Sequence, residues 1–284
     1  MTPQVLRSVA EVKAWAAELR KAGRRLALVP TMGFLHEGHL SLMREGRRRA
    51  DVVATSIFVN PTQFGPKEDL ARYPRDLEGD LAKCASAGAD VVFAPESGAM
   101  YPPGYQTYVE VTEVSQGLCG ARRPGHFRGV ATIVTQLLAL FRPDVALFGE
   151  KDYQQLQVIK ALNRDLHLGA EIVGMPTIRE ADGLAMSSRN AYLGAEERKR
   201  ALAISRGLGA AQGLARAGTL EASALTEAVR RELRAADLRE DYVELVDAER
   251  LTPLSTLQPG TPARLLVAAF CGTTRLIDNQ PIGG

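Results

Sequence analysis

Two histidines stand three residues apart in a segment that could bind a nucleotide. The segment reads Pro-Thr-Met-Gly-Phe-Leu-His-Glu-Gly-His at residues 30–39, and it follows a short apolar run. Backbone N–H groups at the start of a helix attract anions, and Gly38 would let a phosphate approach the backbone closely. Because imidazoles at His36 and His39 could add hydrogen bonds, the spacing suits a triphosphate.

The same histidine pair has two competing interpretations. A zinc protease motif requires His-Glu-x-x-His, whereas only two residues separate His36 from His39, and no third ligand cluster stands nearby in the sequence. We therefore expect no metal ligation by this histidine pair. Simple capping of a helix start remains open as the structural alternative.

Two further segments carry groups suited to phosphate. Lys151 follows an apolar run within Gly149-Glu150-Lys151-Asp152, so its cation could neutralise charge over the end of a parallel strand. A Lys-Asp turn in solvent is an equally good interpretation. Residues 186–189 read Met-Ser-Ser-Arg and offer two hydroxyls and a guanidinium for a departing pyrophosphate, although Ser and Arg are common in surface loops. Neither a Walker phosphate loop nor a Gly-x-Gly-x-x-Gly fingerprint after the first strand is present.

These residues need a scaffold, and the first 175 residues alternate between short apolar runs and amphipathic stretches. Strands are expected at 26–29, where Pro30 should end the strand, and at 52–59, 90–93, 145–148 and 172–174. Helices are expected after the capping box of Ser8 and Glu11, and at 38–49, 77–87, 130–141 and 153–166. The alternation predicts an α/β fold with a Rossmann-type parallel sheet. Loops 30–39, 59–65 and 148–152 should then converge on one crevice.

The pattern changes beyond Met175. Longer helices are expected at 195–217 and 221–235, followed by strands near 242–246 and 264–270. This predicts domains 1–175 and 176–284, the second a smaller C-terminal α+β domain.

Composition limits the possible partners. The 284 residues are 45% hydrophobic and carry a formal charge of +2, which gives no bulk reason to bind nucleic acid or an anionic membrane. The basic residues at 47–49 are interpreted as a solvated helix end. The three cysteines are odd in number and form no Cys-x-x-Cys pair, so we expect a reducing compartment. Since no signal peptide or membrane span is recognisable, a cytoplasmic location is expected.

The motifs together carry a family resemblance. His-x-Gly-His after the first strand and Met-Ser-Ser-Arg after the last resemble the signature segments of the nucleotidyl-transferring superfamily that includes class I aminoacyl-tRNA synthetases. A closer resemblance, to the pantothenate synthetase family, rests on the segments at 30–39, 58–64, 73–75, 123–127, 148–155 and 186–190.

This resemblance implies an activity and an assembly. Such an enzyme joins pantoate to β-alanine with ATP and Mg²⁺ through an acyl adenylate, and releases AMP and pyrophosphate on the route to vitamin B5 and coenzyme A. The fold would be a Rossmann-type domain that binds ATP and pantoate, with a small C-terminal domain that closes over the ATP site. The protein would be a homodimer.

The resemblance also assigns residues. Pantoate contacts carry over to Gln63 and Gln155, and His39 matches the residue usually assigned as the proton donor, with His36 and Lys151 as further catalytic residues. ATP contacts carry over to Met32, Gly33, Phe34, Leu35, His36, Glu37, Gly38, His39, Gly149, Glu150, Lys151, Asp152, Ile178, Met186, Ser187, Ser188 and Arg189.

Some assignments stay open. Asn60, Arg123 and His126 could line the same pocket or be structural. An acidic pair implicated in Mg²⁺ binding in some relatives is only partly present in Glu78-Gly79-Asp80, so no protein ligand for Mg²⁺ is assigned. Three other functions remain possible: a nucleotidyltransferase of the same superfamily acting on another small substrate, a tRNA-charging enzyme, and a nucleotide sensor without catalysis.

Overall fold

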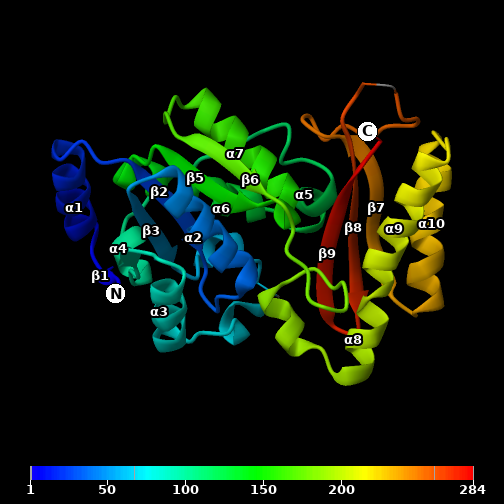
Figure 1. Ribbon diagram of the computed structural model, residues 1–284, viewed down its shortest axis with the longest axis horizontal. Coiled ribbons are helices and arrows are strands. Elements are labelled where there is room, and N and C mark those ends of the chain that lie inside the picture. Colours follow the sequence, from blue (N-terminus) through cyan, green and yellow to red (C-terminus); the bar gives the residue numbers. More distant parts are fainter. Residues whose placement is uncertain (1, 67, 259, 284) are drawn as a thin grey trace. The chain divides into compact units, whose positions relative to one another are not determined.

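A computed structural model describes residues 2–66, 68–258 and 260–283 of the chain (Figure 1). The chain forms two compact units. The first comprises residues 1–115, 123–150 and 158–176. The second comprises residues 116–122, 151–157 and 177–284, so it includes two short segments that precede residue 176.

The first unit contains a six-stranded sheet in which every pairing is parallel. This confirms the predicted α/β fold. The strand order is β1-β4-β3-β2-β5-β6. Their bounds are β1 Gln4–Leu6, β2 Leu26–Thr31, β3 Val52–Ile57, β4 Val91–Phe93, β5 Val145–Gly149 and β6 Glu171–Met175. Because the order reverses between β2 and β5, the loops that follow these two strands flank the topological switch point, where ligands bind in such sheets.

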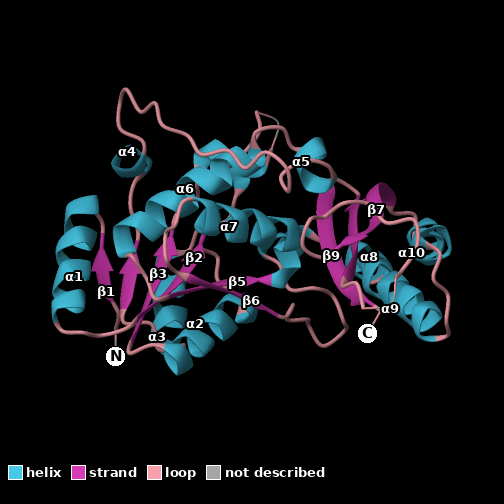
Figure 2. Cartoon of the chain, turned by 90° about the horizontal axis from the view of Figure 1, so that it is seen from above, coloured by secondary structure: helices cyan, strands magenta, loops and turns pink. Residues whose placement is uncertain are grey.

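Helices cover both faces of this sheet, with α2 and α3 on one side and α6 on the other (Figure 2). The helices that begin in the first unit are α1 Val9–Lys21, α2 Glu37–Arg49, α3 Leu77–Ser86, α4 Ser97–Met100 and α6 His126–Phe141; α7 Tyr153–Asp165 has its first turn in the second unit. The Ser8 side chain accepts a hydrogen bond from the Glu11 backbone, and the Glu11 carboxylate accepts one from the Ser8 N–H. The predicted capping box therefore starts α1.

The sheet is buried, which explains its apolar strands. Leu28 and Val29 in β2, Val53 in β3 and Leu147 in β5 are fully buried. Since both faces of a parallel sheet are covered by helices, such strands read as continuous apolar runs.

The predicted end of the first expected strand was wrong, because β2 continues through Pro30 to Thr31 instead of ending before the proline. Beyond Leu28 the strand pairs with β3 alone, whereas its pairing with β5 covers Ala27 and Leu28. Proline is compatible with a strand where one side needs no donor. The strand expected at 52–59 ends earlier, at Ile57, and the helix expected at 130–141 begins earlier, at His126.

The arginines at the end of α2 are engaged by acids. Arg47 pairs with Asp90 and donates to the Asp51 and Gly88 carbonyls, and Arg48 and Arg49 both pair with Glu45. These contacts tie the helix end to neighbouring loops, so the segment is more than the solvated helix end that the sequence suggested.

The second unit contains an antiparallel sheet in the order β7-β8-β9. The strands are β7 Arg239–Asp247, β8 Ala263–Cys271 and β9 Thr274–Ile282, and the helices are α5 Leu118–Arg122, α8 Ala195–Ala201, α9 Ala203–Arg216 and α10 Ala222–Ala235. The single helix expected at 195–217 is interrupted at Leu202, and neither β1 nor β9 was predicted. Buried Leu208, Leu225 and Val229 of α9 and α10 share one apolar cluster with Leu265 and Val267 of β8.

In the ranges that the structure describes, no helix combines the length and apolarity that crossing a membrane requires.

Candidate active site

The segment between β2 and α2 places two imidazoles at the start of a helix. His36 is the N-cap residue of α2, and the His36 and His39 ring centroids lie 4.1 Å apart. A Cβ on Gly38 would lie 2.9 Å from the Cε1 and Nδ1 atoms of His36. Only glycine at position 38 therefore allows the His36 ring to lie against the first turn of the helix.

His39 both caps the helix and offers a defined tautomer. Its Nδ1 accepts a hydrogen bond of 3.3 Å from the His36 backbone N–H. An accepting Nδ1 carries no proton, so the neutral ring carries its proton on Nε2. The capping interpretation and the phosphate-binding interpretation are therefore compatible, because they use different nitrogens of the ring.

Glu37, which follows the N-cap, is engaged by its own helix. Its carboxylate forms an ion pair with Arg44. The Arg44 hydrogen bond holds the pKa of Glu37 below its ordinary value. A carboxylate in the first turn suits the helix dipole, so a local role explains this residue.

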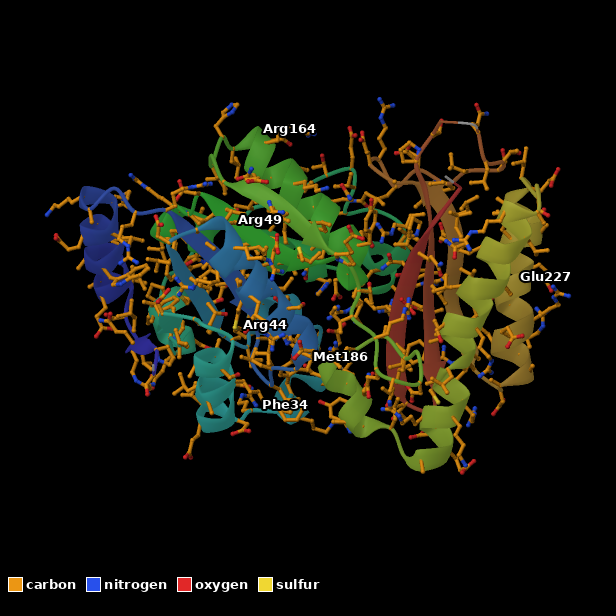
Figure 3. The ribbon with its side chains drawn as sticks, viewed as in Figure 1. Phe34, Arg44, Arg49, Arg164, Met186 and Glu227 are labelled. Carbon is orange, nitrogen blue, oxygen red and sulfur yellow. The ribbon has the colours of Figure 1, made fainter. Side chains whose placement is uncertain are left out.

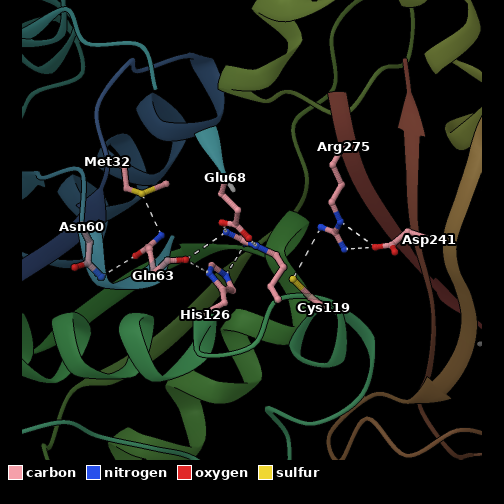
Figure 4. Close-up of polar contacts among 9 residues, drawn as sticks. Met32, Asn60, Gln63, Glu68, Cys119, His126, Asp241 and Arg275 are labelled. Atoms are coloured by element: carbon pink, nitrogen blue, oxygen red, sulfur yellow. Dashed lines mark hydrogen bonds and ion pairs between the residues drawn. The ribbon is translucent and has the colours of Figure 1, made fainter. Parts of the chain in front are cut away.

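Gln63 lies beside the same segment although thirty-one residues separate it from Met32. Gln63 ends the 3-10 helix Pro61–Gln63, and the residue is 7% exposed. Its Nε2 contacts the Met32 Sδ at 3.1 Å, and its Oε1 accepts from the Asn60 Nδ2 at 3.0 Å (Figure 4). The fold therefore brings loops 30–39 and 59–65 together, as expected.

Asn60 has a structural role. Its Nδ2 also donates to the Gly129 carbonyl at 3.1 Å, and its Oδ1 accepts from the Tyr101 hydroxyl at 2.8 Å. A Cβ on Gly129 would lie 2.4 Å from the Thr62 carbonyl oxygen, so α6 approaches this loop at backbone contact. Burial raises the pKa of the Tyr101 hydroxyl to about 12, which keeps it a donor at neutral pH.

Arg123 and His126 support the backbone of Gln63. The His126 Nδ1 lies 2.8 Å from the Gln63 carbonyl oxygen, so Nδ1 carries the proton, and Nε2 accepts from Arg123 at 3.0 Å. Arg123 also forms an ion pair of 2.6 Å with Glu68. Burial raises the pKa of Glu68, but the Arg123 guanidinium outweighs this effect and holds it below the ordinary value. Glu68 was not singled out from the sequence.

Gly149 and Glu150 follow β5, on the other side of the switch point from β2. Gly149 pairs with Met175 at the end of β6, and Glu150 opens the 3-10 helix Glu150–Asp152. A Cβ on Gly149 would meet no atom within 4 Å, so its small size is not required by packing.

In the second unit, Lys151 is anchored through its backbone. Its carbonyl oxygen accepts from the Asn279 Nδ2 at 2.9 Å, and its Nζ lies 3.7 Å from the Asp152 carboxylate. The Lys151 side chain is 18% exposed, so the Lys-Asp turn in open solvent does not describe it.

The first turn of α7 contains two neighbouring glutamines that differ in burial. Gln154 is buried, and its amide accepts from the Cys119 N–H and donates to the Gln116 carbonyl, both at 3.0 Å. Gln155, the residue predicted to bind substrate, is half-buried. Gln154 thus holds the start of α5, while Gln155 is partly exposed.

Residues 178 and 186, which are distant in sequence, are neighbours in a tight hairpin. The Met186 N–H donates to the Ile178 carbonyl at 2.9 Å, and the Glu180 N–H donates to that of Leu184 at 2.8 Å. Ser187 caps the 3-10 helix Ser188–Tyr192 by accepting from the Arg189 N–H. The hairpin therefore brings the predicted nucleotide contacts of this segment together.

Other side chains of the second unit are held by internal pairs. Arg275 forms a salt bridge of 2.8 Å with Asp241, and its guanidinium lies 4.0 Å from the Cys119 sulfur (Figure 4).

The three cysteines of the chain, Cys84, Cys119 and Cys271, are all buried free thiols. Charged side chains such as Arg44, Arg49, Arg164 and Glu227 lie outward on their helices (Figure 3).

Comparison with known proteins gives a consistent result over nearly the whole chain. A family model described as pantoate-beta-alanine ligase matches residues 4–281. A pantothenate synthetase of Myxococcus xanthus is 79% identical and covers 100% of this chain and 98% of the relative. One from Geobacter sulfurreducens is 52% identical and covers 99% of each chain.

Solved structures are also similar over nearly the whole chain. Pantothenate synthetase from Thermus thermophilus superimposes with a TM-score of 0.92 at 46% identity, over 98% of each chain. Pantoate-beta-alanine ligase from Francisella tularensis, complexed with Beta-gamma ATP and β-alanine, gives a TM-score of 0.82 at 32% identity, over 98% of this chain and 97% of that one.

Proposed function

The chain belongs to the pantoate-β-alanine ligase family and is an ATP-dependent ligase of pantoate and β-alanine; we propose that the two substrates react through a pantoyl adenylate. The position and the residues of segment 32–39 support this mechanism best. It follows the strand at the topological switch point and presents His36 and His39 at a helix start, where phosphate oxygens are stabilised by N–H groups.

We propose that ATP is bound by the residues that the family resemblance assigns to it. The first unit would contribute Met32 to His39, Gly149 and Glu150, and the second would contribute Lys151, Asp152, Ile178 and Met186 to Arg189. The basic and hydroxyl side chains among them would contact the phosphates, and the backbone at Ile178 and Met186 would lie beside the base.

The first chemical step would join pantoate to the nucleotide. A carboxylate oxygen of pantoate attacks the α-phosphorus, and the bond to pyrophosphate breaks. Nε2–H of His39 is a hydrogen-bond donor in the tautomer set by His36, so it is suited to a phosphate oxygen that gains charge. Lys151 and Arg189 supply positive charge to the same phosphates, and no enzyme nucleophile is required.

The second step would form the amide. The free amine of β-alanine attacks the carbonyl carbon of the mixed anhydride, and AMP leaves with the electrons of the broken C–O bond. Gln63 and Gln155 would orient pantoate by hydrogen bonds. Because amides do not titrate at neutral pH, they can hold the reactants without competing for protons.

Mg²⁺ would accompany ATP. Among the residues that the structure describes, no three His, Cys, Asp or Glu side chains gather in a way that could hold a metal ion. We propose that the ion is held by the phosphates and water, as is usual for Mg²⁺, where it would supply charge neutralisation.

We also infer a cytoplasmic homodimer that does not bind nucleic acid. The location is supported by the three free thiols, which suit a reducing compartment. The basic end of α2 is neutralised by Glu45 and Asp90, which leaves it poorly suited to a phosphate backbone. The dimer rests on the family resemblance, and light scattering would test it.

The mechanism is tested by product analysis with each substrate omitted in turn. With ATP, Mg²⁺ and pantoate alone we expect about one equivalent of pyrophosphate per enzyme and no AMP, because the adenylate stays bound. Adding β-alanine should give continuous AMP release. Continuous pyrophosphate release without an amine, and no AMP with it, would favour a nucleotidyltransferase of the same superfamily.

Residue roles are tested by His39→Ala and Lys151→Ala. Each should lower kcat/KM by about 10²-fold, the usual effect of losing one preorganised contact to developing charge. Arg164→Ala serves as the control, because Arg164 lies near the end of α7 with an exposed side chain. Near-parental activity of either test variant would refute its assigned role.

A further inference from the structure

The turn at residues 33–35 has an unusual backbone that something must hold. Gly33 has a φ of 82° and Phe34 a φ of 51°, so two successive residues lie in the left-handed region. Phenylalanine adopts this region rarely, because its Cβ crowds the carbonyl that follows. The turn leads directly through Leu35 into His36 and the start of α2. Its shape therefore determines where both histidines lie.

The carboxylate of Asp80 holds this turn. Asp80 lies in the first turns of α3, and its side chain is 1% exposed. Its Oδ2 accepts from the Phe34 N–H at 2.7 Å, and its Oδ1 accepts from the Leu35 N–H at 2.7 Å. Two consecutive backbone donors are thus satisfied by the two oxygens of one buried carboxylate. Hydrogen bonds of this charge-assisted kind are about twice as strong as neutral ones.

Lys83, which lies one helical turn after Asp80, also binds this turn, but as a hydrogen-bond donor. Its Nζ donates to the Leu35 carbonyl at 2.9 Å and lies 5.8 Å from the centre of the Phe34 ring. The distance from Nζ to the Asp80 Oδ1 is 4.0 Å. The α3 side chains therefore bind both the donors and an acceptor of residues 34 and 35.

Packing leaves little room for the turn to shift. A Cβ on Gly33 would lie 3.0 Å from the Asp80 Oδ2 and 3.0 Å from the Ile57 Cγ2. A side chain at position 33 would therefore crowd both the Asp80 carboxylate and Ile57, so the turn requires glycine there.

A role for Asp80 as a Mg²⁺ ligand fits this geometry poorly. Each oxygen is already directed at a backbone N–H, and a divalent cation bound to Oδ1 would face the ammonium of Lys83. Repulsion between like charges would oppose such binding.

We propose that Asp80 is a positioning residue of the ligase: it fixes the 33–35 turn, and thereby His36 and His39, without touching ATP or Mg²⁺. The inference rests on the proposed nucleotide-binding role of segment 32–39. Lys83 assists by holding the Leu35 carbonyl. Because misplacing a catalytic group by about 1 Å costs on the order of 10²-fold, loss of the carboxylate should reduce turnover although no substrate contact is removed.

The test compares Asp80→Asn with Glu78→Gln, which changes the same charge on an exposed residue of the same helix. In Asp80→Asn an NH₂ group replaces one acceptor and faces a backbone N–H. We expect a 10- to 100-fold lower kcat/KM. The Mg²⁺ concentration that gives half-maximal activity should stay within about twofold of the parent, and Glu78→Gln should match the parent in both.

Hydrogen exchange provides a readout that does not depend on activity. Measured by mass spectrometry without ATP or Mg²⁺, peptides covering residues 33–36 should exchange at least tenfold faster in Asp80→Asn, because one of the two amides loses its acceptor and the other keeps only a neutral, weaker one. Peptides covering β3 should be unchanged and serve as the internal reference. Unchanged exchange at 33–36 would overturn the proposal, and so would a tenfold higher Mg²⁺ requirement with activity restored by excess Mg²⁺.

If Asp80→Asn fails to fold, Lys83→Met tests the proposal in its place. It retains Asp80 and the apolar stem but removes the donor to Leu35, so faster exchange of the same peptides with a smaller loss of activity is expected. Unchanged exchange in this variant would also overturn the proposal. If the parent enzyme itself released no AMP from pantoate, β-alanine and ATP, the proposed function would fail, whereas the exchange results would still decide whether Asp80 holds the turn.

Discussion

Two segments that are proposed to bind the same nucleotide are held in different ways. In the first unit, the turn at 33–35 is held by the side chain of Asp80, which is 46 residues from Phe34 and 45 from Leu35, and Gln63 is supported by His126, 63 residues away. In the second unit, the hairpin at 178–186 closes through backbone hydrogen bonds between residues at most eight apart. The first segment depends on tertiary structure for its shape, whereas the second shapes itself and needs only an anchor.

The largest effect is expected from Gly129→Ala in α6. The new Cβ would lie 2.4 Å from the Thr62 carbonyl oxygen and 2.6 Å from the Gln63 Cα, so the 3-10 helix must move. We expect kcat/KM to fall by about 10²-fold, with a loss of about 1–3 kcal/mol in stability. Steady-state kinetics and urea unfolding measure the two effects. The matched control is Gly209→Ala at an exposed position of α9, where a Cβ meets no atom within 4 Å and stability should rise slightly. Equal behaviour of the two variants would contradict long-range support of Gln63.

Arg179→Met should remove the anchor of the hairpin and preserve its shape. Arg179 forms a bidentate pair with Asp278 of β9, at 2.6 and 3.0 Å, and the Asp278 side chain is 3% exposed. Leaving that carboxylate buried without its partner should cost about 2–3 kcal/mol, somewhat less than for a fully buried pair because Arg179 is partly exposed. Urea unfolding measures the loss. The double variant Arg179→Met, Asp278→Asn should regain part of it, and a double variant no more stable than the single one would argue against an unpaired charge as the cause.

Glu68→Gln should change how stability depends on pH. The folded-state pKa of Glu68 lies below its ordinary value of 4.5, so its ion pair with Arg123 stabilises the fold fully above that value and progressively less as the pH falls through the folded-state pKa. The variant should be about 1 kcal/mol less stable at pH 7, and the difference should shrink on acidification. Unfolding curves between pH 3 and 7, the range set by the ordinary carboxyl pKa, measure it. A difference that is constant with pH would mean that the lost contact is not ionic.

Asn190→Ala should have the smallest effect, although it removes two hydrogen bonds. The Asn190 Nδ2 donates to the Glu180 carboxylate at 2.6 Å and to the Ala185 carbonyl at 3.0 Å. Its Oδ1 is buried and has no hydrogen-bond partner in the part of the chain that the structure describes, so truncation also removes an unsatisfied acceptor. We expect a loss below about 1 kcal/mol in urea unfolding. A loss as large as that of Arg179→Met would show that the hairpin does not shape itself.

The sequence predicted elements best where the signal was local. The capping box at Ser8 and Glu11 and the apolar run of β2 depend on neighbouring residues, and both were recognised. The end of β2 was misplaced because a strand can include Pro30 only where one of its sides needs no hydrogen-bond donor. The sequence does not reveal which sides of the strand are paired.

The missed strand β9 illustrates the limit more clearly. Its Asp278 and Asn279 are 4% exposed each, yet both are polar and Pro281 follows, so no apolar alternation marks a strand. Asp278 is buried because Arg179 pairs with it, and Asn279 because it binds the Lys151 carbonyl. Burial that depends on distant partners has no periodicity that a sequence could display.

The residues of the candidate site also differ in whether their type and spacing reveal them in the sequence. Residues such as His36, His39 and Lys151 were identified by type and spacing, and their joint action on one nucleotide stays a prediction. The supporting roles of Asp80 and Glu68 could not be predicted, because a buried carboxylate and a solvated one look alike in sequence.

The contact from the His36 N–H to the His39 Nδ1 limits what this imidazole can do in the reaction. While that hydrogen bond lasts, the neutral ring can give a proton from Nε2 but has no lone pair there with which to take one. An amine such as that of β-alanine is mostly an ammonium ion at neutral pH, as a lysine is. His39 is therefore a poor acceptor for its surplus proton, which must leave through water or a phosphate oxygen, and amide formation should accelerate in alkaline buffer.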